Sequence, residues 1–267
     1  MLDRDQIFED ETLLTSAVRE AGTLAMSFFG RGLKGTHKPD NTPVSEADLA
    51  VDRLLHERLT RPRPSYGWLS EETADNPRRL EAERVWIVDP IDGTRAFLAG
   101  LPEWTVAAAL VEDGQPRIGV VYNPATDEMF TARRGAGAFL NRAQVAVRQR
   151  SEIEGSCLIV TKGFFKHKVW TQPWPRIDRV WVNSIAYRLA LIAAGRADGT
   201  LALSAKSEWD LAAAVLLVQE AGGKATDANG AAFRFNQPIP RMSGLVAAAP
   251  ALHELLVART RPLAGRD

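Results

Sequence analysis

The chain has 267 residues, 45% hydrophobic and 25% charged, and its 33 Lys and Arg balance 33 Asp and Glu. This composition is that of a globular protein of one large or two ordinary domains with an ample core. Zero net charge gives no general attraction to a nucleic acid polymer or an anionic membrane, and no apolar run reaches the ~18 residues of a membrane span. The single cysteine, Cys157, excludes a disulfide framework within the chain, and the acidic N-terminal segment has no signal-peptide core, which together favour a cytoplasmic protein.

The first half of the chain alternates between helical and strand patterns. Apolar spacing predicts an amphipathic helix over residues 12–29, and a second helix follows TPVSEAD (42–48), with Ser45 and Asp48 spaced as an N-cap pair. A short strand over residues 66–69 ends in Ser70, Glu71 and Glu72. Alternating segments at 105–112, 117–122, 128–132 and 138–140 predict an antiparallel meander. The polar stretch 148–156 predicts a boundary between helices packed on an antiparallel sheet (residues 1–150) and a second domain (151–267).

The second half follows an α/β pattern. Strands are predicted at 158–161, 179–182, 200–203 and 245–248, and helices at 184–194, 208–221 and 251–259. Ser207 is placed to cap the second of these helices, with Asp210 in its first turn.

The segment VWIVDPIDGTRAF (85–97) carries the most specific chemistry. A buried strand ends in Asp89 and Asp92, and Gly93 and Thr94 open a helix. A helix N-terminus offers unpaired N–H groups to an anion, while the two acids can hold a hard cation beside it. An anion beside Mg²⁺ is most often a phosphate, although the same motif alone is compatible with an ordinary turn after a core strand.

Five acids stand at strand ends or helix starts within apolar segments: Asp48, Glu71, Asp89, Asp92 and Asp210. Two carboxylates ~4 Å apart repel by about 4 kcal/mol at an effective dielectric constant of 20, so a cluster of them requires cations or protons. Oxygen ligands without histidine or cysteine suit Mg²⁺ better than zinc. Taken together, these acids predict a metal-dependent phosphomonoester hydrolase.

The motifs LSEE (69–72), DPIDGT (89–94) and WDLAAA (209–214) occur in an order and spacing that resemble the inositol monophosphatase superfamily. TPVSEAD, AGRADG (194–199) and EAGG (220–223) extend the resemblance over nearly the whole chain. It implies a layered α-β-α-β-α sandwich, an α/β or α+β fold, and a lithium-sensitive phosphatase that uses two to three Mg²⁺ ions. Homodimers are common in this superfamily.

The resemblance also implies roles for individual residues. Glu71, Asp89 and the carbonyl of Ile91 would hold one Mg²⁺, and Asp89, Asp92 and Asp210 a second. Glu71 would also reach a weakly held third ion. Asp48 and Thr94 would orient and deprotonate the attacking water, and the backbone of Gly93 and Thr94 would hold the phosphate.

The residues expected to contact the substrate differ from those of inositol-specific members of the superfamily. Many of them carry a glutamate seven residues before the WD aspartate, where this chain has Leu203. KPDNTPVSEAD (38–48), LSEE and Arg95 look more like the 3'(2'),5'-bisphosphate nucleotidase and histidinol-phosphatase branches. We expect the nucleotidase activity first, with inositol-1-monophosphatase and then histidinol-phosphatase as the alternatives. Candidates to bind a second phosphate are Lys38, Arg95, Arg188 and Lys206, any of which could be an ordinary surface charge. Ser184 follows Asn183, where the superfamily commonly has Gly-Ser.

Other readings of the acidic motifs are less consistent with the spacing. A haloacid-dehalogenase phosphatase has one residue between its two aspartates, whereas Asp89 and Asp92 are separated by two. No P-loop motif occurs, and Ile91 stands where an EF-hand loop needs an oxygen ligand. A catalytically silent relative that binds phosphate or metal is the non-enzyme alternative.

Overall fold

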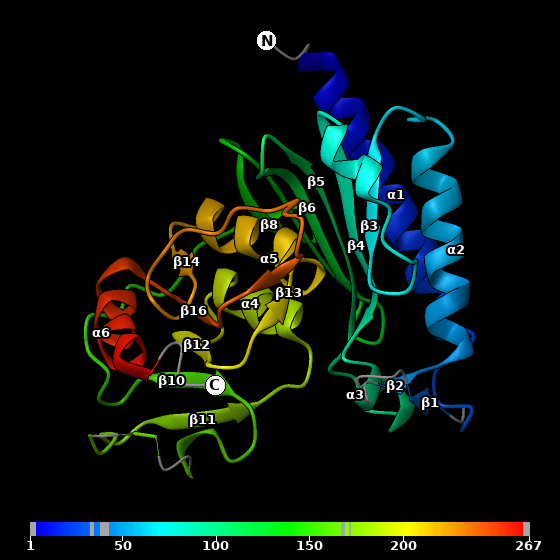
Figure 1. Ribbon diagram of the computed structural model, residues 1–267. Coiled ribbons are helices and arrows are strands. Elements are labelled where there is room, and N and C mark those ends of the chain that lie inside the picture. The colour runs from blue at the N-terminus through cyan, green and yellow to red at the C-terminus, as the bar shows by residue number, and fades with distance from the viewer. Residues whose placement is uncertain (1–3, 33–34, 38–42, 167–168, 171, 264–267) are drawn as a thin grey trace.

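The computed structural model describes residues 4–32, 35–37, 43–166, 169–170 and 172–263. Its elements form five layers of alternating helices and sheets (Figure 1). The outer layer contains α1 (Arg4–Met26) and α2 (Glu46–Thr60), the central layer contains α4 (Ile185–Ala193) and α5 (Glu208–Glu220), and α6 (Pro250–Thr260) covers the far sheet. The layered α-β-α-β-α sandwich expected from the sequence is therefore confirmed.

The first sheet has seven strands in chain order. It comprises β3 (Gly67–Ser70), β4 (Arg84–Asp92), β5 (Thr105–Glu112), β6 (Gln115–Asn123), β7 (Glu128–Arg133), β8 (Gly137–Leu140) and β9 (Ala143–Val145). Only β3 and β4 pair in parallel, and the others form the predicted antiparallel meander. The parallel pair is possible because the chain crosses back through the 3-10 helix η1 (Pro77–Glu81).

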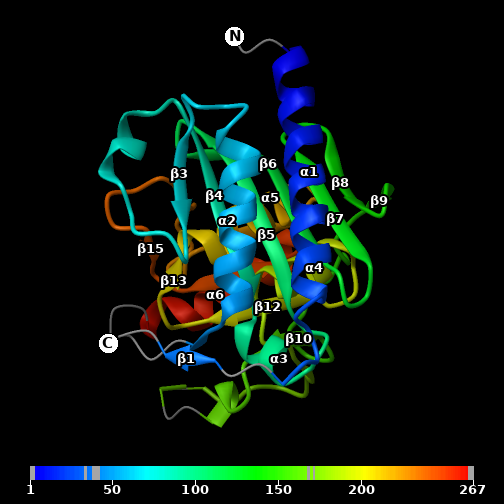
Figure 2. The ribbon, with the colours of Figure 1, turned by 90° about the vertical axis from the view of Figure 1, so that its right-hand side faces the viewer.

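Helices bury both faces of this sheet, and successive side chains on each strand point to alternate faces. On β4, Trp86 and Val88 pack with α1 and α2, whereas Val85 and Ile87 pack with α4 and α5. Figure 2 shows α1 and α2 in front of this sheet, covering one of its faces. A Cβ added at Gly119 on β6 would lie 2.5 Å from the Ala213 carbonyl oxygen, so this glycine lets α5 approach the sheet closely.

The second sheet has five strands in the order β11-β10-β12-β16-β14. These are β10 (Cys157–Val160), β11 (Asp178–Trp181), β12 (Gly199–Ala202), β14 (Lys224–Thr226) and β16 (Leu245–Ala248). β10 pairs in parallel with β11 and β12, while β16 is antiparallel to β12 and β14. The central cluster of buried residues includes side chains from before and after the stretch 148–156, and the domain boundary there stays a prediction.

Several short elements differ from the sequence expectation. α1 begins at Arg4, eight residues before the predicted start at residue 12, and β9 and β14 were not predicted. Two small sheets were also not predicted: β1 (Thr36–His37) with β2 (Pro43–Val44), and β13 (Lys206–Ser207) with β15 (Arg241–Met242). Strands of two or three residues carry no periodicity to detect. The remaining short elements are α3 (Thr94–Leu98), η2 (Phe164–Lys166) and η3 (Arg261–Leu263).

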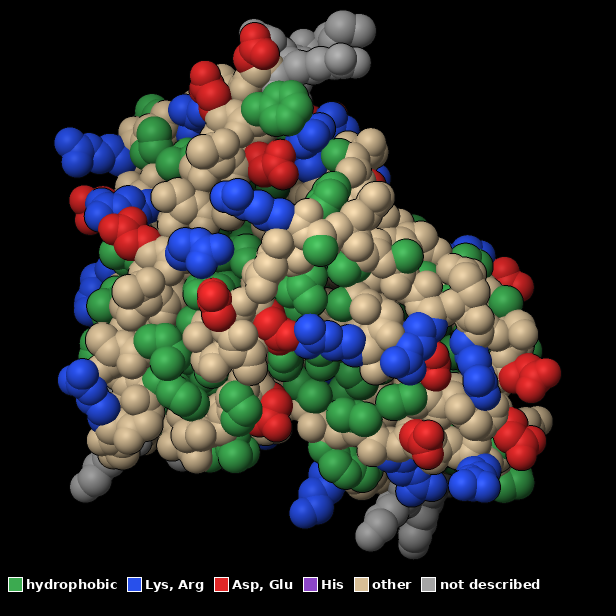
Figure 3. Space-filling model, turned by 180° about the vertical axis from the view of Figure 1, so that it is seen from behind, with side chains coloured by type: hydrophobic (Ala, Val, Ile, Leu, Met, Phe, Trp, Pro, Cys, Tyr) green, Lys and Arg blue, Asp and Glu red, His purple; other side chains and the backbone are tan. Residues whose placement is uncertain are grey.

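The surface agrees with the balanced composition. Acidic and basic side chains are interspersed over the face seen in Figure 3, without a broad patch of one sign. Among the described residues, no helix has both the length and the apolar character required to cross a membrane.

Candidate active site

The parallel pairing of β3 and β4 brings two acidic turns together. The register aligns Ser70 with Val88, and the Glu71 amide donates to the Val88 carbonyl oxygen at 3.3 Å. Glu71, the residue after β3, therefore lies beside Asp89 on β4, where the turn begins. The structure thus places the two acidic strand ends side by side.

The turn after Asp89 departs from regular strand geometry. The register between β4 and β5 shifts between Asp89 and Asp92, and Gly93 adopts a φ of 96° as the N-cap of α3. A Cβ at Gly93 would lie 2.9 Å from the Glu103 carbonyl oxygen, so glycine is needed for both its conformation and its size. This turn directs the Thr94 hydroxyl to the Ile91 carbonyl oxygen, 3.1 Å away.

Asp48 on α2 serves as a helix cap and as part of the site. Its Oδ2 accepts the Ser45 amide at 2.8 Å and the Ser45 hydroxyl at 2.6 Å, while its Oδ1 accepts the Thr94 hydroxyl at 3.2 Å. Burial raises the pKa of Asp48, and hydrogen bonds from Ser45 oppose the shift. Asp48 can therefore cap α2 and contact Thr94 at the same time, because each role uses a different carboxylate oxygen.

Asp92 is held by the start of α4. Its Oδ2 accepts the Ser184 hydroxyl and the Ala186 amide, each at 2.5 Å. Burial raises the pKa of Asp92 to about 6, against the lowering effect of these hydrogen bonds. Ser184 is itself buried and caps α4 by accepting the Tyr187 amide at 2.9 Å, so it acts here as a partner of Asp92.

Asp210, in the first turn of α5, repeats the geometry of Asp48. Its Oδ2 accepts the Ser207 amide at 3.0 Å in a capping box. Burial, followed by the charges of Asp92 and Glu71, raises the pKa of Asp210 to about 7. The pKa of Asp89 is raised by burial and then by the charges of the other four acids. All five acids predicted from the sequence therefore share one electrostatic neighbourhood.

A hard cation fits the chemistry of this neighbourhood. Asp89 is buried, and its Oδ1 has no hydrogen-bond partner within the described part of the chain. Carboxylate oxygens and the Ile91 carbonyl are the ligand types that Mg²⁺ prefers. However, no three His, Cys, Asp or Glu side chains among the described residues are already arranged to hold a metal ion. The partnerless Asp89 oxygen nevertheless favours a cation site, because mutually repelling carboxylates converge fully only around a cation.

The predicted basic residues lie in different environments. Lys206 is half-buried and donates to the Ser204 hydroxyl at 2.8 Å; burial lowers its pKa, and the nearby charges of Asp210 and Asp92 oppose this shift. Arg188 is buried, its Nε donates to the Val182 carbonyl oxygen at 2.7 Å, and burial lowers its pKa to about 10. Arg95 is exposed on α3, and Lys38 lies outside the described residues.

Sequence reasoning did not identify Glu208, which supports the start of α5. Its buried carboxylate accepts the amides of Asn236 and Gln237 at 2.6 and 2.8 Å, and burial raises its pKa to about 7. Arg241 was also missed; it pairs with Ser207 between β13 and β15, and its charge acts on Lys206. Spacing gives no signal for either residue, because their partners are about 30 residues away in the chain.

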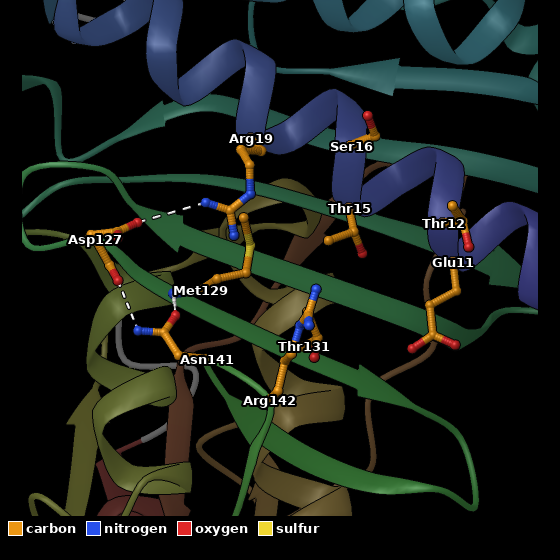
Figure 4. Close-up of a pocket in the computed structure, with 10 residues that line it drawn as sticks. All are labelled: Glu11, Thr12, Thr15, Ser16, Arg19, Asp127, Met129, Thr131, Asn141 and Arg142. Atoms are coloured by element: carbon orange, nitrogen blue, oxygen red, sulfur yellow. Dashed lines mark hydrogen bonds and ion pairs between the residues drawn. The ribbon is translucent and has the colours of Figure 1, made fainter.

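A cavity of about 830 Å³ lies between α1 and the strands around β7, away from these acids (Figure 4). In it, Arg19 lies 3.6 Å from Asp127, and Asn141 donates to the Asp127 carbonyl oxygen at 2.9 Å. None of the site residues predicted from the sequence lines this cavity. Size therefore does not identify the candidate active site; the acidic turns do.

Comparison with known proteins agrees with this geometry. The sequence profile of the "Inositol monophosphatase family" matches residues 9–263. The chain belongs to the inositol monophosphatase family. The family assignment and the fold expected from the sequence motifs are thus confirmed.

Members of the family resemble the chain over most of its length. An inositol-1-monophosphatase of Rhizobium meliloti (strain 1021) is 35% identical over 228 residues, 82% of this chain and 85% of its own. A histidinol-phosphatase of Chlorobaculum parvum is 35% identical over 257 residues, 93% of this chain and 95% of its own. The crystal structure of the extragenic suppressor protein suhB from Bartonella henselae superposes with a TM-score of 0.82 at 31% identity, covering 94% of this chain and 97% of that one.

The raised pKa values predict how pH acts on the metal-free protein. The pKa values of Asp92 and Asp210, about 6 and about 7, lie above the ordinary aspartate value of 3.8, and that of Glu208 is also about 7. Between pH 4 and 7 these three carboxyl groups bind more protons in the folded than in the unfolded state. They outweigh the single opposing shift of His253, whose pKa burial lowers to about 4, so the free energy of unfolding falls as the pH rises. We expect the Tm to fall over this window in calorimetry without divalent metal.

Mg²⁺ should raise the Tm more at pH 8 than at pH 5, because it binds the ionised carboxylates. A Tm increase of the same size at both pH values would contradict this interpretation. The same scans in NaCl of matched ionic strength control for general screening.

Proposed function

We propose that the chain is a Mg²⁺-dependent phosphomonoester hydrolase in which water attacks a small-molecule phosphate. The observation that carries the proposal is the buried Asp89 carboxylate, which has a partnerless oxygen in the described structure and lies among four other acids. Family membership supports phosphatase chemistry. Glu71, Asp89 and the Ile91 carbonyl are assigned to one ion and Asp89, Asp92 and Asp210 to a second, with Glu71 reaching a third.

The groups of the chain have separable roles in this proposal. When bound, Mg²⁺ neutralises charge on the phosphate and lowers the pKa of water. The Thr94 hydroxyl, which donates to Asp48, can accept a proton from the attacking water while its own proton passes to Asp48. Burial raises the pKa of Asp48, which makes its carboxylate a better proton acceptor. Backbone amides of Gly93 and Thr94, at the start of α3, would hold the phosphate.

The acids assigned to both ions can be tested by removing one charge at a time. Asp89→Asn and Asp210→Asn should each lower kcat by orders of magnitude at saturating Mg²⁺. Their Tm without metal should not fall by much, because each change also removes a repelling charge. Asp178→Asn, on the exposed strand β11, serves as the control. If Asp210 served only to cap the helix, asparagine would replace it with little loss. Near-normal turnover of Asp210→Asn would therefore rule out the second metal site.

Lithium sensitivity is a further part of the proposal, based on family resemblance. Li⁺ is close to Mg²⁺ in radius and has half its charge, so it can replace the second ion after hydrolysis and retain phosphate. We expect inhibition at millimolar LiCl that deepens as substrate approaches saturation. Turnover unaffected at ~50 mM LiCl, with NaCl as the control, would contradict lithium sensitivity and leave Mg²⁺ dependence in place.

For the substrate we favour adenosine 3',5'-bisphosphate over inositol 1-phosphate. Leu203 is partly buried against the apolar cluster under α6, so its side chain offers no acceptor to inositol hydroxyls. Lys206 places a cation near Asp210, where a second phosphate of a nucleotide could bind. Inositol 1-phosphate and then histidinol phosphate are the alternatives, because an inositol-1-monophosphatase and a histidinol-phosphatase are each 35% identical, over 82% and 93% of this chain.

The substrate proposal predicts a ranking of kcat/KM among these three phosphates in one buffer. Leaving sugar hydroxyls unpaired costs about 1 to 3 kcal/mol each, so inositol 1-phosphate should be at least tenfold poorer than the nucleotide. Lys206→Met should lower kcat/KM for the nucleotide about tenfold or more and leave inositol 1-phosphate little changed. Lys224→Met, which removes an exposed lysine paired with Glu254, is the matched control.

A tenfold preference for inositol 1-phosphate would overturn the choice of nucleotide. A preference for histidinol phosphate would instead favour a histidinol-phosphatase. Either result keeps the metal-dependent phosphatase.

A further inference from the structure

Asp52 on α2 joins the helix that carries Asp48 to the turn that carries Glu71. Its side chain is buried, one helical turn after Asp48. Oδ1 accepts the Ser70 hydroxyl and Oδ2 accepts the Thr73 hydroxyl, each at 2.5 Å. Ser70 and Thr73 flank Glu71 and Glu72, so one carboxylate holds both ends of the acidic turn.

The acidic turn needs such a support because the sheet ends there. Ser70 is the last residue of β3, and the Glu71 amide makes the final bond to β4. The Ser70 hydroxyl also accepts the Glu72 amide at 3.4 Å. Beyond this point the side chain of Asp52 holds Ser70 and Thr73, the two ends of the segment that carries Glu71.

The chemistry of Asp52 is unusual for a residue that only stabilises the fold. Among the described residues, no Lys or Arg forms an ion pair with it. A buried carboxylate bound to two neutral hydroxyls costs more desolvation free energy than a neutral amide of the same shape. The two hydrogen bonds instead tie both of its oxygens to the ends of the acidic turn.

The same helix also fixes the other side of the site. Asp48 accepts the Thr94 hydroxyl after β4, and Asp52 accepts the two hydroxyls after β3. α2 thus sets the spacing between the turn of Glu71 and the pair formed by Asp48 and Thr94. Residues that orient metal ligands in this way typically change metal affinity 10- to 100-fold when mutated.

We propose that Asp52 is a positioning residue that holds Glu71 for Mg²⁺ through the hydroxyls of Ser70 and Thr73. It touches neither substrate nor the reacting atoms. This inference rests on the proposed function, in which Glu71 is a metal ligand.

The test measures binding of Mg²⁺ alone by isothermal titration calorimetry, together with the Tm shift that Mg²⁺ causes. Asp52→Ala removes both hydrogen bonds and should weaken Mg²⁺ binding at least tenfold. Thr73→Val removes one bond in nearly the same shape and should weaken binding by a smaller factor. Asp52→Asn should stay within about threefold of the wild type, because the amide can donate to the Thr73 oxygen while still accepting from Ser70.

Asp10→Ala is the matched control. Asp10 is a buried carboxylate on α1 that accepts the Tyr66 hydroxyl at 2.8 Å and Arg63 Nε at 2.6 Å. It supports the opposite ends of β3 and β4, so this variant should lower the Tm and leave Mg²⁺ affinity unchanged.

The outcomes separate this inference from the proposed function. Absence of Mg²⁺ binding by the wild type would overturn the proposed function itself. Wild-type binding with unchanged affinity in Asp52→Ala and Thr73→Val would overturn the positioning role alone. If Asp52→Ala and Asp10→Ala lost Mg²⁺ affinity equally, the loss would come from general destabilisation of the fold. If Asp52→Asn lost as much Mg²⁺ affinity as Asp52→Ala, the loss would come from removal of the negative charge. Each of these two results contradicts positioning through the hydroxyls, and Thr73→Val keeps the test open if Asp52→Ala fails to fold.

Discussion

Mutual repulsion among buried carboxylates is the constraint on which the rest of this site depends. Asp89 lies at its centre, and the charges of Glu71, Asp92, Asp210 and Asp48 all raise its pKa. A single pair ~4 Å apart repels by about 4 kcal/mol at an effective dielectric constant of 20. The fold offsets part of this cost with dipoles: Asp48 and Asp210 accept the amides of their own helix caps, and Asp92 accepts groups from the start of α4. The remainder is what a divalent cation would neutralise.

The layered architecture is what allows acids from distant segments to meet. The parallel pair β3 and β4 supplies two turns at one sheet edge, α2 approaches from one face, and α4 and α5 approach from the other. Gly119 lets α5 pack closely on β6, and Gly93 lets the turn after β4 pass beside Glu103 and Ser184. Hydrophobic packing therefore determines the distances among charges that would otherwise separate.

The sequence predicted the parts of the structure that depend on local pattern. The strand at 245–248 and that at 105–112 coincide with β16 and β5, and the acidic motifs identified the family and all five clustered acids. The same reasoning read Asp48 and Asp210 as possible caps, and the structure shows capping boxes at both.

What the sequence could not supply are contacts made only by tertiary packing. Asp52 meets hydroxyls 18 and 21 residues away, and Glu208 meets backbone amides 28 and 29 residues away, with no motif to mark them. Burial of Arg188 against backbone carbonyl oxygens was equally invisible, because its position in the sequence resembles that of any helix-surface arginine. The start of α1 was missed because its first turns extend beyond the apolar repeat used to define it.

Metal binding by the clustered acids is tested most directly by a crystal structure of the protein soaked with Mn²⁺ as a substitute for Mg²⁺. Anomalous difference maps would locate the ions. We expect at least two anomalous peaks, one within ligand distance of Glu71, Asp89 and the Ile91 carbonyl and one shared by Asp89, Asp92 and Asp210. Absence of peaks among these residues, at Mn²⁺ concentrations that support turnover, would contradict the claim that the acids converge on metal ions.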